Sequence, residues 1–86
     1  MAFYQILYWR DIPAQIKVSE PGRRPLSRTL PDRFQQEIDR VAMREGLHGT
    51  DDYLNQWHWT EKKEVPGPAA EVAETILREL LEANPE

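Results

Sequence analysis

The chain has 86 residues, enough for a single domain spanning residues 1–86, with no cysteine and a net charge of −4. The missing cysteines exclude disulfides and thiolate metal sites, and the acidic balance argues against general nucleic-acid binding. No apolar run approaches the roughly 20 residues of a membrane span, and the first residues lack a signal-peptide pattern. We therefore expect a cytoplasmic protein that does not cross a membrane.

Charge is unevenly distributed along the chain. Residues 1–47 carry eight Lys and Arg against six Asp and Glu, whereas residues 48–86 carry three against nine. Such a separation can orient a protein on a partner. Two differently solvated faces explain it more simply, and we favour that explanation.

Residues 3–18 predict a β-hairpin. Apolar side chains occupy both sides of residues 3–10, which is typical of a central strand. Pro13 then interrupts the run, and residues 14–18 alternate apolar and polar side chains as a half-buried strand does. The short connection makes the two strands antiparallel neighbours.

Residues 19–30 are predicted to be an Arg-rich loop, because they hold a Pro-Gly turn signal and a second proline that prevents helix. Residues 31–45 predict an amphipathic helix. It begins at Pro31, a residue suited to the first helical position, and it stops at Gly46. Its apolar residues recur at spacings of four, three and one, which gives a narrow apolar stripe.

Residues 48–64 are predicted to form a turn followed by a third strand. Within them, residues 50–56 are open to two interpretations, a short helix capped by Thr50 or an extended start of the strand. We favour the short helix. Residues 68–83 carry the strongest apolar face in the chain and predict a C-terminal helix opened by Pro68.

The predicted element order is therefore β-β-α-β-α, which makes an α+β domain. A right-handed crossover places the third strand parallel to the second. The apolar first strand then lies in the middle of a three-stranded mixed sheet of order 2-1-3. Both helices are expected to cover one face, which leaves Tyr4, Ile6 and Tyr8 for an exposed patch on the other.

Two histidines and two neighbouring acids raise the question of a metal or catalytic site. His48 and His58 are ten residues apart, a spacing that matches no standard zinc motif. Asp51 and Asp52 equally suit the first turn of a capped helix. No serine carries a nucleophile motif. We therefore favour a non-enzymatic protein without catalytic residues or cofactor, and keep His48, His58 and Asp51 as weak metal candidates.

Four arginines gather around the predicted start of the first helix. Arg23, Arg24 and Arg28 lie in the loop before it, and Arg33 lies in its first turn. Guanidinium groups beside free helix N–H groups suit a phosphate or a carboxylate, or an acidic partner surface. No glycine-rich phosphate loop accompanies them, and a solvated connector is the simpler explanation.

Aromatic residues are clustered, because residues 4–9 and 53–59 hold six of the eight. Aromatic side chains and arginines are frequent anchors of protein interfaces, although aromatic side chains also fill cores. Alternation places both tryptophans of the predicted third strand on one face. The residues expected to bind a partner or an anion are Tyr4, Tyr8, Trp57, Trp59, Arg23, Arg24, Arg28 and Arg33.

The segments YWRDIPAQI, LPDRFQQEIDRVAM and GTDDYLNQW, with an RR pair between the first two, resemble the small bacterial domain family labelled "virulence factor". The matching positions are Tyr8, Arg10, Asp11, Ile12, Pro13, Arg33, Phe34, Ile38, Asp39, Ala42, Gly49, Asp51, Tyr53 and Trp57. The resemblance covers residues 4–59, and members occur alone or joined to helical-repeat proteins. It implies a bacterial cytosolic setting and an accessory role, and it brings no reaction, cofactor or catalytic residue.

Several of these matching positions are charged. Arg10 and Asp11 lie at the predicted hairpin tip, and Asp39 lies in the helix. We expect a structural ion-pair cluster that joins the hairpin to the helix, in preference to a ligand site.

The leading hypothesis is an accessory or adaptor module that binds another protein, or a second copy of itself, through an aromatic sheet surface and the Arg-rich loop. The alternative is a small-anion or phosphate-binding protein that uses the Arg-rich loop next to the helix N-terminus. A metal-dependent enzyme is the third possibility.

Overall fold

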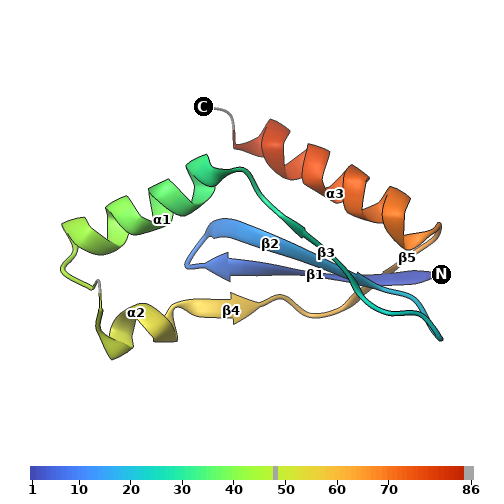
Figure 1. Cartoon of the computed structure of the whole chain (residues 1–86), viewed down its shortest axis with the longest axis horizontal. Coiled ribbons are helices and arrows are strands. Elements are labelled where there is room, and N and C mark those ends of the chain that lie inside the picture. The colour runs from blue at the N-terminus through green and yellow to red at the C-terminus, as the bar shows by residue number, and fades with distance from the viewer. Residues whose placement is uncertain (48, 85–86) are drawn as a thin grey trace.

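The computed structural model describes residues 1–47 and 49–84, which form a five-stranded sheet and three helices (Figure 1). The α+β class is as predicted. The strands are β1 (Ala2–Trp9), β2 (Ile12–Ser19), β3 (Leu26–Thr29), β4 (Trp57–Trp59) and β5 (Lys63–Val65), and the helices are α1 (Asp32–Arg44), α2 (Asp51–Asn55) and α3 (Ala69–Ala83).

The sheet differs from the predicted one in strand number, order and type. Its order is β3-β2-β1-β4, and β5 also pairs with β1. Every pairing is antiparallel, so the sheet is not mixed. β1 does lie inside the sheet, as its two-sided apolar pattern predicts.

One of the additional strands, β3, lies inside the predicted Arg-rich loop. It pairs with β2, with Leu26 opposite Val18 and Arg28 opposite Ile16. The segment is only four residues long, and prolines at positions 25 and 31 bracket it. Those prolines favour a loop. A strand of four residues is too short to show a clear alternation, so the sequence pattern did not reveal it.

The predicted third strand is split into two. β4 pairs with residues 7–9 of β1, and β5 pairs with residues 2–4. Between them, the Thr60 N–H donates to the Ile6 carbonyl and the Thr60 hydroxyl accepts from the Ile6 N–H, both at 3.0 Å. A side-chain oxygen thus takes a place in the ladder that a backbone carbonyl would occupy in a regular strand.

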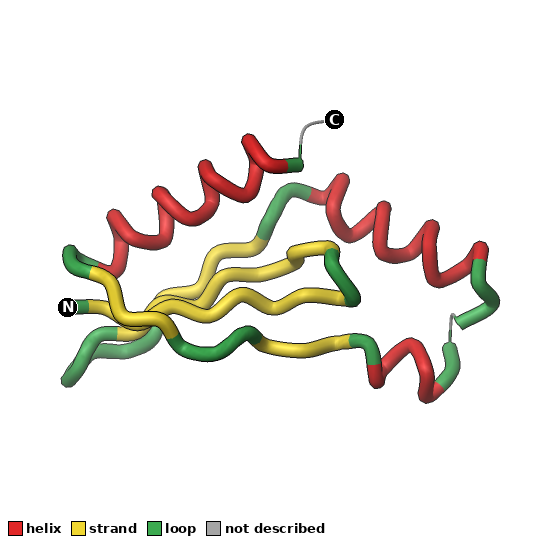
Figure 2. Tube along the Cα trace, turned by 180° about the vertical axis from the view of Figure 1, so that it is seen from behind, coloured by secondary structure: helices red, strands yellow, loops and turns green. Residues whose placement is uncertain are grey.

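The main core lies between the sheet and the two long helices. Ile6 and Ile16 face each other across β1 and β2, and α3 packs on them through Val72, Ala73 and Ile76. Phe34 of α1 joins the same cluster. Figures 1 and 2 show α1 and α3 along the same side of the sheet, as predicted.

The side of the sheet that these helices cover was wrongly predicted. Ile6 is buried, and Tyr4 and Tyr8 pack against the main core. These three residues therefore do not form the exposed patch expected of them. Both sides of β1 are apolar, so the sequence alone did not determine which side would receive the helices.

A second cluster closes the hairpin end of the sheet. Trp9, Ile38 and Ala42 are fully buried there, with Tyr53 and Trp57 packed around them. The Trp9 Nε1–H donates to the Tyr53 carbonyl at 2.9 Å, so its buried polar group is satisfied. α1 and α2 lie at this end of the molecule (Figure 2).

The helix ends follow local rules. After α1, the Gly46 N–H bonds to the Met43 carbonyl and the Leu47 N–H to the Ala42 carbonyl, while Gly46 has a φ of +71°. This is a glycine-dependent C-terminal cap. The favoured short helix is present as α2, where the Tyr53 N–H donates to the Thr50 hydroxyl at 3.3 Å.

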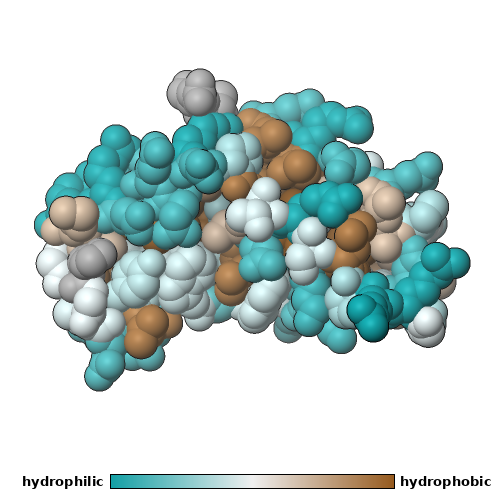
Figure 3. Space-filling model, in the orientation of Figure 1, coloured by the Kyte–Doolittle hydropathy of each residue, from teal (hydrophilic) through white to brown (hydrophobic). Residues whose placement is uncertain are grey.

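The surface pattern agrees with this packing. In Figure 3, the outer surface of α1 is hydrophilic, and apolar side chains gather toward the middle of the visible face, between the long helices and over the strands. None of the helices in the described part of the chain is long and apolar enough to cross a membrane.

Candidate functional site

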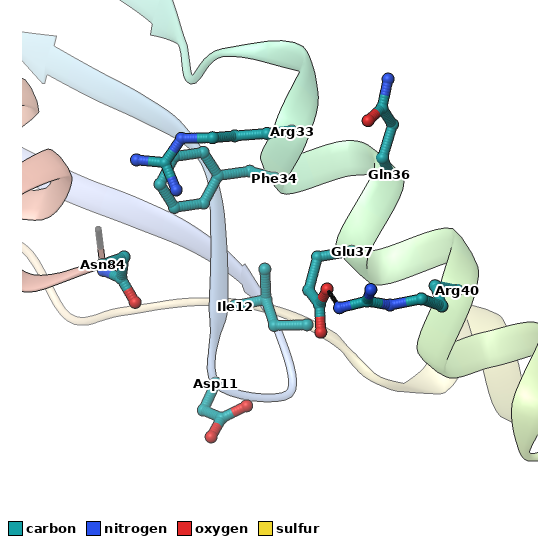
Figure 4. Close-up of a pocket in the computed structure, with 8 residues that line it drawn as sticks. All are labelled: Asp11, Ile12, Arg33, Phe34, Gln36, Glu37, Arg40 and Asn84. Carbon is teal, nitrogen blue, oxygen red and sulfur yellow. Dashed lines mark hydrogen bonds and ion pairs between the residues drawn. The ribbon is translucent and has the colours of Figure 1, made fainter. Parts of the chain in front are cut away.

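A groove of about 740 Å³ lies between the hairpin turn, α1 and the end of α3 (Figure 4). We call it the hairpin groove. Ile12 and Phe34 contribute apolar surface to it, and polar side chains surround them. It is lined by Asp11, Ile12, Arg33, Phe34, Gln36, Glu37, Arg40 and Asn84.

The hairpin groove carries charges of both signs. The Arg33 guanidinium lies over the Phe34 ring, 4.4 Å from its centroid, in a cation–π contact. Arg40 and Glu37 form an ion pair one turn apart on α1. Because these opposite charges offset each other, the groove has no single sign of charge that would select an anion or a cation.

Arg10 links the hairpin turn to both neighbouring helices. Its backbone adopts a φ of +57°, and its N–H donates to the Gln56 carbonyl at 3.1 Å. Its guanidinium donates to the Glu45 carboxylate at 2.6 Å and lies 5.0 Å from the Trp9 ring. The hydrogen bond between the two side chains raises the pKa of Arg10 and lowers the pKa of Glu45.

The predicted ion-pair cluster therefore has a different membership. Arg10 does join the hairpin to α1, through Glu45 and not through Asp39. Asp39 accepts a hydrogen bond from Gln35 within α1 at 3.0 Å. Asp11 lines the hairpin groove.

The side of the sheet turned away from α1 and α3 has its own set of side chains, and we call it the open face. Alternation gives its membership along residues 3–7 of β1, because the pairs that flank the core pairs of β1 and β2 point the other way. Beyond the register shift at Leu7/Tyr8, Trp9 and its partner Trp57 pack in the second cluster with α1 and are not part of the open face. The neighbouring strands add the partners of those residues. The open face consists of Phe3, Gln5, Leu7, Gln15, Lys17, Ser19, Ser27, Thr29, Trp59 and Glu64.

Three large apolar side chains lie on the open face. Leu7 lies directly opposite Trp59, which is 43% exposed, and Phe3 follows farther along β1. None of the three belongs to either core cluster. A sheet face that only meets water is normally polar, whereas a face that docks a protein presents aromatic and aliphatic anchors.

The four aromatic residues predicted to form a binding surface have separate environments. Tyr4 packs against the main core, and Tyr8 stacks on His58 with ring centroids 5.9 Å apart. Burial raises the pKa of Tyr8. Trp57 is half-buried and meets the Tyr53 ring edge-on. Trp59 is the most exposed of the four.

The four arginines are dispersed. Arg23 and Arg24 lie in the exposed turn before β3, at the far end of that strand from α1, and four strand residues span about 13 Å. Arg23 pairs with Glu20 at 3.5 Å. Arg28 pairs with Glu74 of α3 at 3.2 Å. Arg33 lines the hairpin groove.

Within the described residues, the weak metal candidates His58 and Asp51 gain no further ligands. The His58 ring lies 3.3 Å from the Gln56 carbonyl, and Asp51 lies in the first turn of α2. His48 lies outside the described residues. Across residues 1–47 and 49–84, no group of three or more His, Cys, Asp or Glu side chains could hold a metal ion.

Sequence reasoning missed Phe3, Leu7 and Lys17 of the open face and Glu45 of the Arg10 ion pair. For the open face, alternation was the available signal, since Phe3 and Leu7 necessarily point away from Ile6. Glu45 carried no such signal, because it lies 35 residues from Arg10 and meets it only in the fold.

Comparison with known proteins adds a family. The model of the family described as "Virulence factor" matches residues 7–86. No curated protein and no solved structure gives a significant match. The match includes α3, which lies beyond the segments that carry the resemblance. With almost the whole length matched, the chain belongs to the virulence factor family.

Proposed function

We propose that this protein is a non-enzymatic accessory module that binds another protein through the open face. The observation that carries the proposal is the group of Phe3, Leu7 and Trp59 on the side of the sheet that α1 and α3 leave uncovered. Trp59 is exposed, and Phe3 and Leu7 on the same face are half-buried; apolar side chains that reach solvent next to one another can mark an interaction site. The exposed turn with Arg23 and Arg24 lies at one end of that face and extends the contact surface.

Both edges of the sheet are poorly suited to pairing with another strand, which favours docking on the open face. On β3, the Arg28 guanidinium donates to the Ser27 carbonyl at 3.2 Å, and Pro25 precedes the strand. The opposite edge is broken between β4 and β5. Short, interrupted or side-chain-blocked edges resist the addition of another strand. We therefore place the contact on the open face and not on an edge strand.

The test is a comparison of three baits in a lysate of the bacterium that encodes the protein. Leu7→Ser with Trp59→Ser removes apolar surface from the open face, and Met43→Ser with Leu54→Ser removes exposed apolar surface elsewhere. A partner retained by wild type and by the Met43/Leu54 variant, and lost from the Leu7/Trp59 variant, is the expected result. Circular dichroism checks folding, and Trp59→Ser alone serves if the double variant unfolds.

Equal capture by all three baits would contradict the proposal. So would a protein that stays monomeric in light scattering and retains no partner. A monomer–dimer equilibrium that Trp59→Ser abolishes would identify a second copy as the partner.

The alternative, a small anion held by the Arg-rich loop, has less support. β3 separates Arg23 and Arg24 from the start of α1, and Arg28 is paired with Glu74. Titration with inorganic phosphate, followed by tryptophan fluorescence, tests it. A response that Arg24→Ala removes would revive this alternative.

A further inference from the structure

We infer that the segment docking on the open face is acidic as well as apolar, with carboxylates close to aliphatic or aromatic side chains. The inference rests on the proposed function and names the chemistry of its partner. It is argued from the charges on and beside the open face.

Lys17 places an uncompensated positive charge in the middle of the open face. Its cross-strand neighbours are Gln5 and Ser27, and its neighbours on the same side of β2 are Gln15 and Ser19. All four are uncharged, and among the described residues no ion pair involves Lys17. An acidic group on a partner would neutralise this charge.

The exposed turn adds positive charge at one end of the same face. β2 ends at Ser19 and β3 begins at Leu26, so residues 20–25 continue directly from the open face. Arg23 and Arg24 are exposed in this turn, and the Arg23 side chain is 79% exposed.

Glu20, the acidic residue of this turn, is directed away from the open face. Glu20 accepts a hydrogen bond from the Ala69 N–H at the start of α3, in addition to its pair with Arg23. Its carboxylate is thus directed to the helix side of the sheet. On the open face itself, the acidic residue is Glu64, opposite Phe3.

The positive charge lies within reach of the apolar anchors. Lys17 is directly opposite Gln5, which places it diagonally between Phe3 and Leu7. Diagonal neighbours on one side of a sheet are about 7–8 Å apart. A partner segment with one carboxylate a residue or two from an apolar side chain would therefore meet Lys17 and Leu7 together.

The same charges argue against a symmetric pairing of two copies. A two-fold contact with Lys17 near its axis would bring the Lys17 side chains of the two copies together. The whole chain has a net charge of −4, so the open face with its turn differs in sign from the rest of the molecule.

The experiment selects random 12-residue peptides displayed on phage against the wild-type protein. The expected peptides are enriched in Asp and Glu next to aromatic or aliphatic residues. A synthetic copy of one selected peptide is then titrated by fluorescence anisotropy. Lys17→Glu is expected to weaken its binding by about tenfold or more, and added salt should weaken wild-type binding.

Lys63→Glu is the matched control, because Lys63 is exposed and pairs with Tyr4 on the helix side of the sheet. It makes the same charge change away from the open face, and binding should stay within about twofold. An equal effect of both substitutions would overturn the inference. Peptides without acidic enrichment, or a failure to select any, would do the same.

Failure of this inference is distinguishable from failure of the proposed function. If the lysate partner is lost with Trp59→Ser but retained by Lys17→Glu, the open face docks a protein of different chemistry. If neither substitution changes capture, both ideas fail. A dimer seen by light scattering and abolished by Lys17→Glu would make the occupant a second copy and overturn the acidic segment.

Discussion

At the scale of single residues, Arg10 makes several contacts that hold the tertiary structure together although its side chain is partly exposed. It combines a left-handed backbone, a backbone hydrogen bond to Gln56 and an ion pair with Glu45. Non-glycine residues pay a steric cost for that backbone conformation. The contacts of Arg10 offset this cost at the point where the hairpin meets α1 and α2.

Two substitutions separate the backbone of Arg10 from its side chain. Arg10→Gly and Arg10→Ala both remove the ion pair, so both should lower the free energy of unfolding. Glycine adopts a φ of +57° without strain, so Arg10→Gly should be more stable than Arg10→Ala by about 1 kcal/mol. Urea denaturation measures the difference, and equal stability of the two variants would contradict the strained turn.

The Arg10–Glu45 pair also predicts a pH dependence. The hydrogen bond from Arg10 lowers the pKa of Glu45 below its ordinary value of 4.5. The pair therefore contributes its full stability above that value and loses it as the pH falls through the lowered pKa. The urea midpoints of wild type and Glu45→Gln should differ at pH 7 and converge toward pH 3. A difference that stays constant would rule out this carboxylate as the titrating group.

At the scale of elements, the two long helices were predicted closely and the short strands were not. Pro31 is the N-cap of α1 and not its first helical residue as predicted, and Gly46 follows the end of the helix; both effects are confined to one turn. β3, β4 and β5 have three or four residues each and exist because β2 and β1 offer them hydrogen bonds. Their stabilising contacts are long-range, so a local pattern does not reveal them.

α1 offers a matched pair of substitutions that tests its packing. Ile38 is fully buried and Met43 is 68% exposed on the same helix. Ile38→Ala should lower the free energy of unfolding by about 2–5 kcal/mol, whereas Met43→Ala should change it by about 0.5 kcal/mol or less. Thermal and urea denaturation of both variants measure this. A small effect of Ile38→Ala would show that the second cluster is loosely packed.

At the scale of the whole molecule, the fold is a two-layer structure, flat and elongated. Its principal extents are 42 × 27 × 16 Å, and its radius of gyration is 14.0 Å, against about 12 Å for a compact domain of this length. A small chain has little apolar surface to bury, and its stability is marginal. A partner on the open face would add the third layer.

The amino-acid sequence by itself determined what depends on near neighbours in the chain. It predicted the hairpin, α1 with its glycine stop, the capped α2, α3 and the α+β class. It also determined that Phe3, Gln5 and Leu7 share one side of β1, because alternation is a property of the strand alone. It did not determine the place of Trp9, which packs against α1 beyond the register shift at Leu7/Tyr8.

Only the tertiary structure decided which side of β1 the helices cover. Since both sides are apolar, α3 had two similar surfaces on which it could pack. Its packing on Ile6 and Ile16 depends on contacts between residues more than fifty positions apart in the chain. This packing places the half-buried Tyr4 and Tyr8 against the main core and leaves Leu7 with Trp59 on the open face. The docking surface therefore follows from a long-range packing preference, which local patterns do not encode.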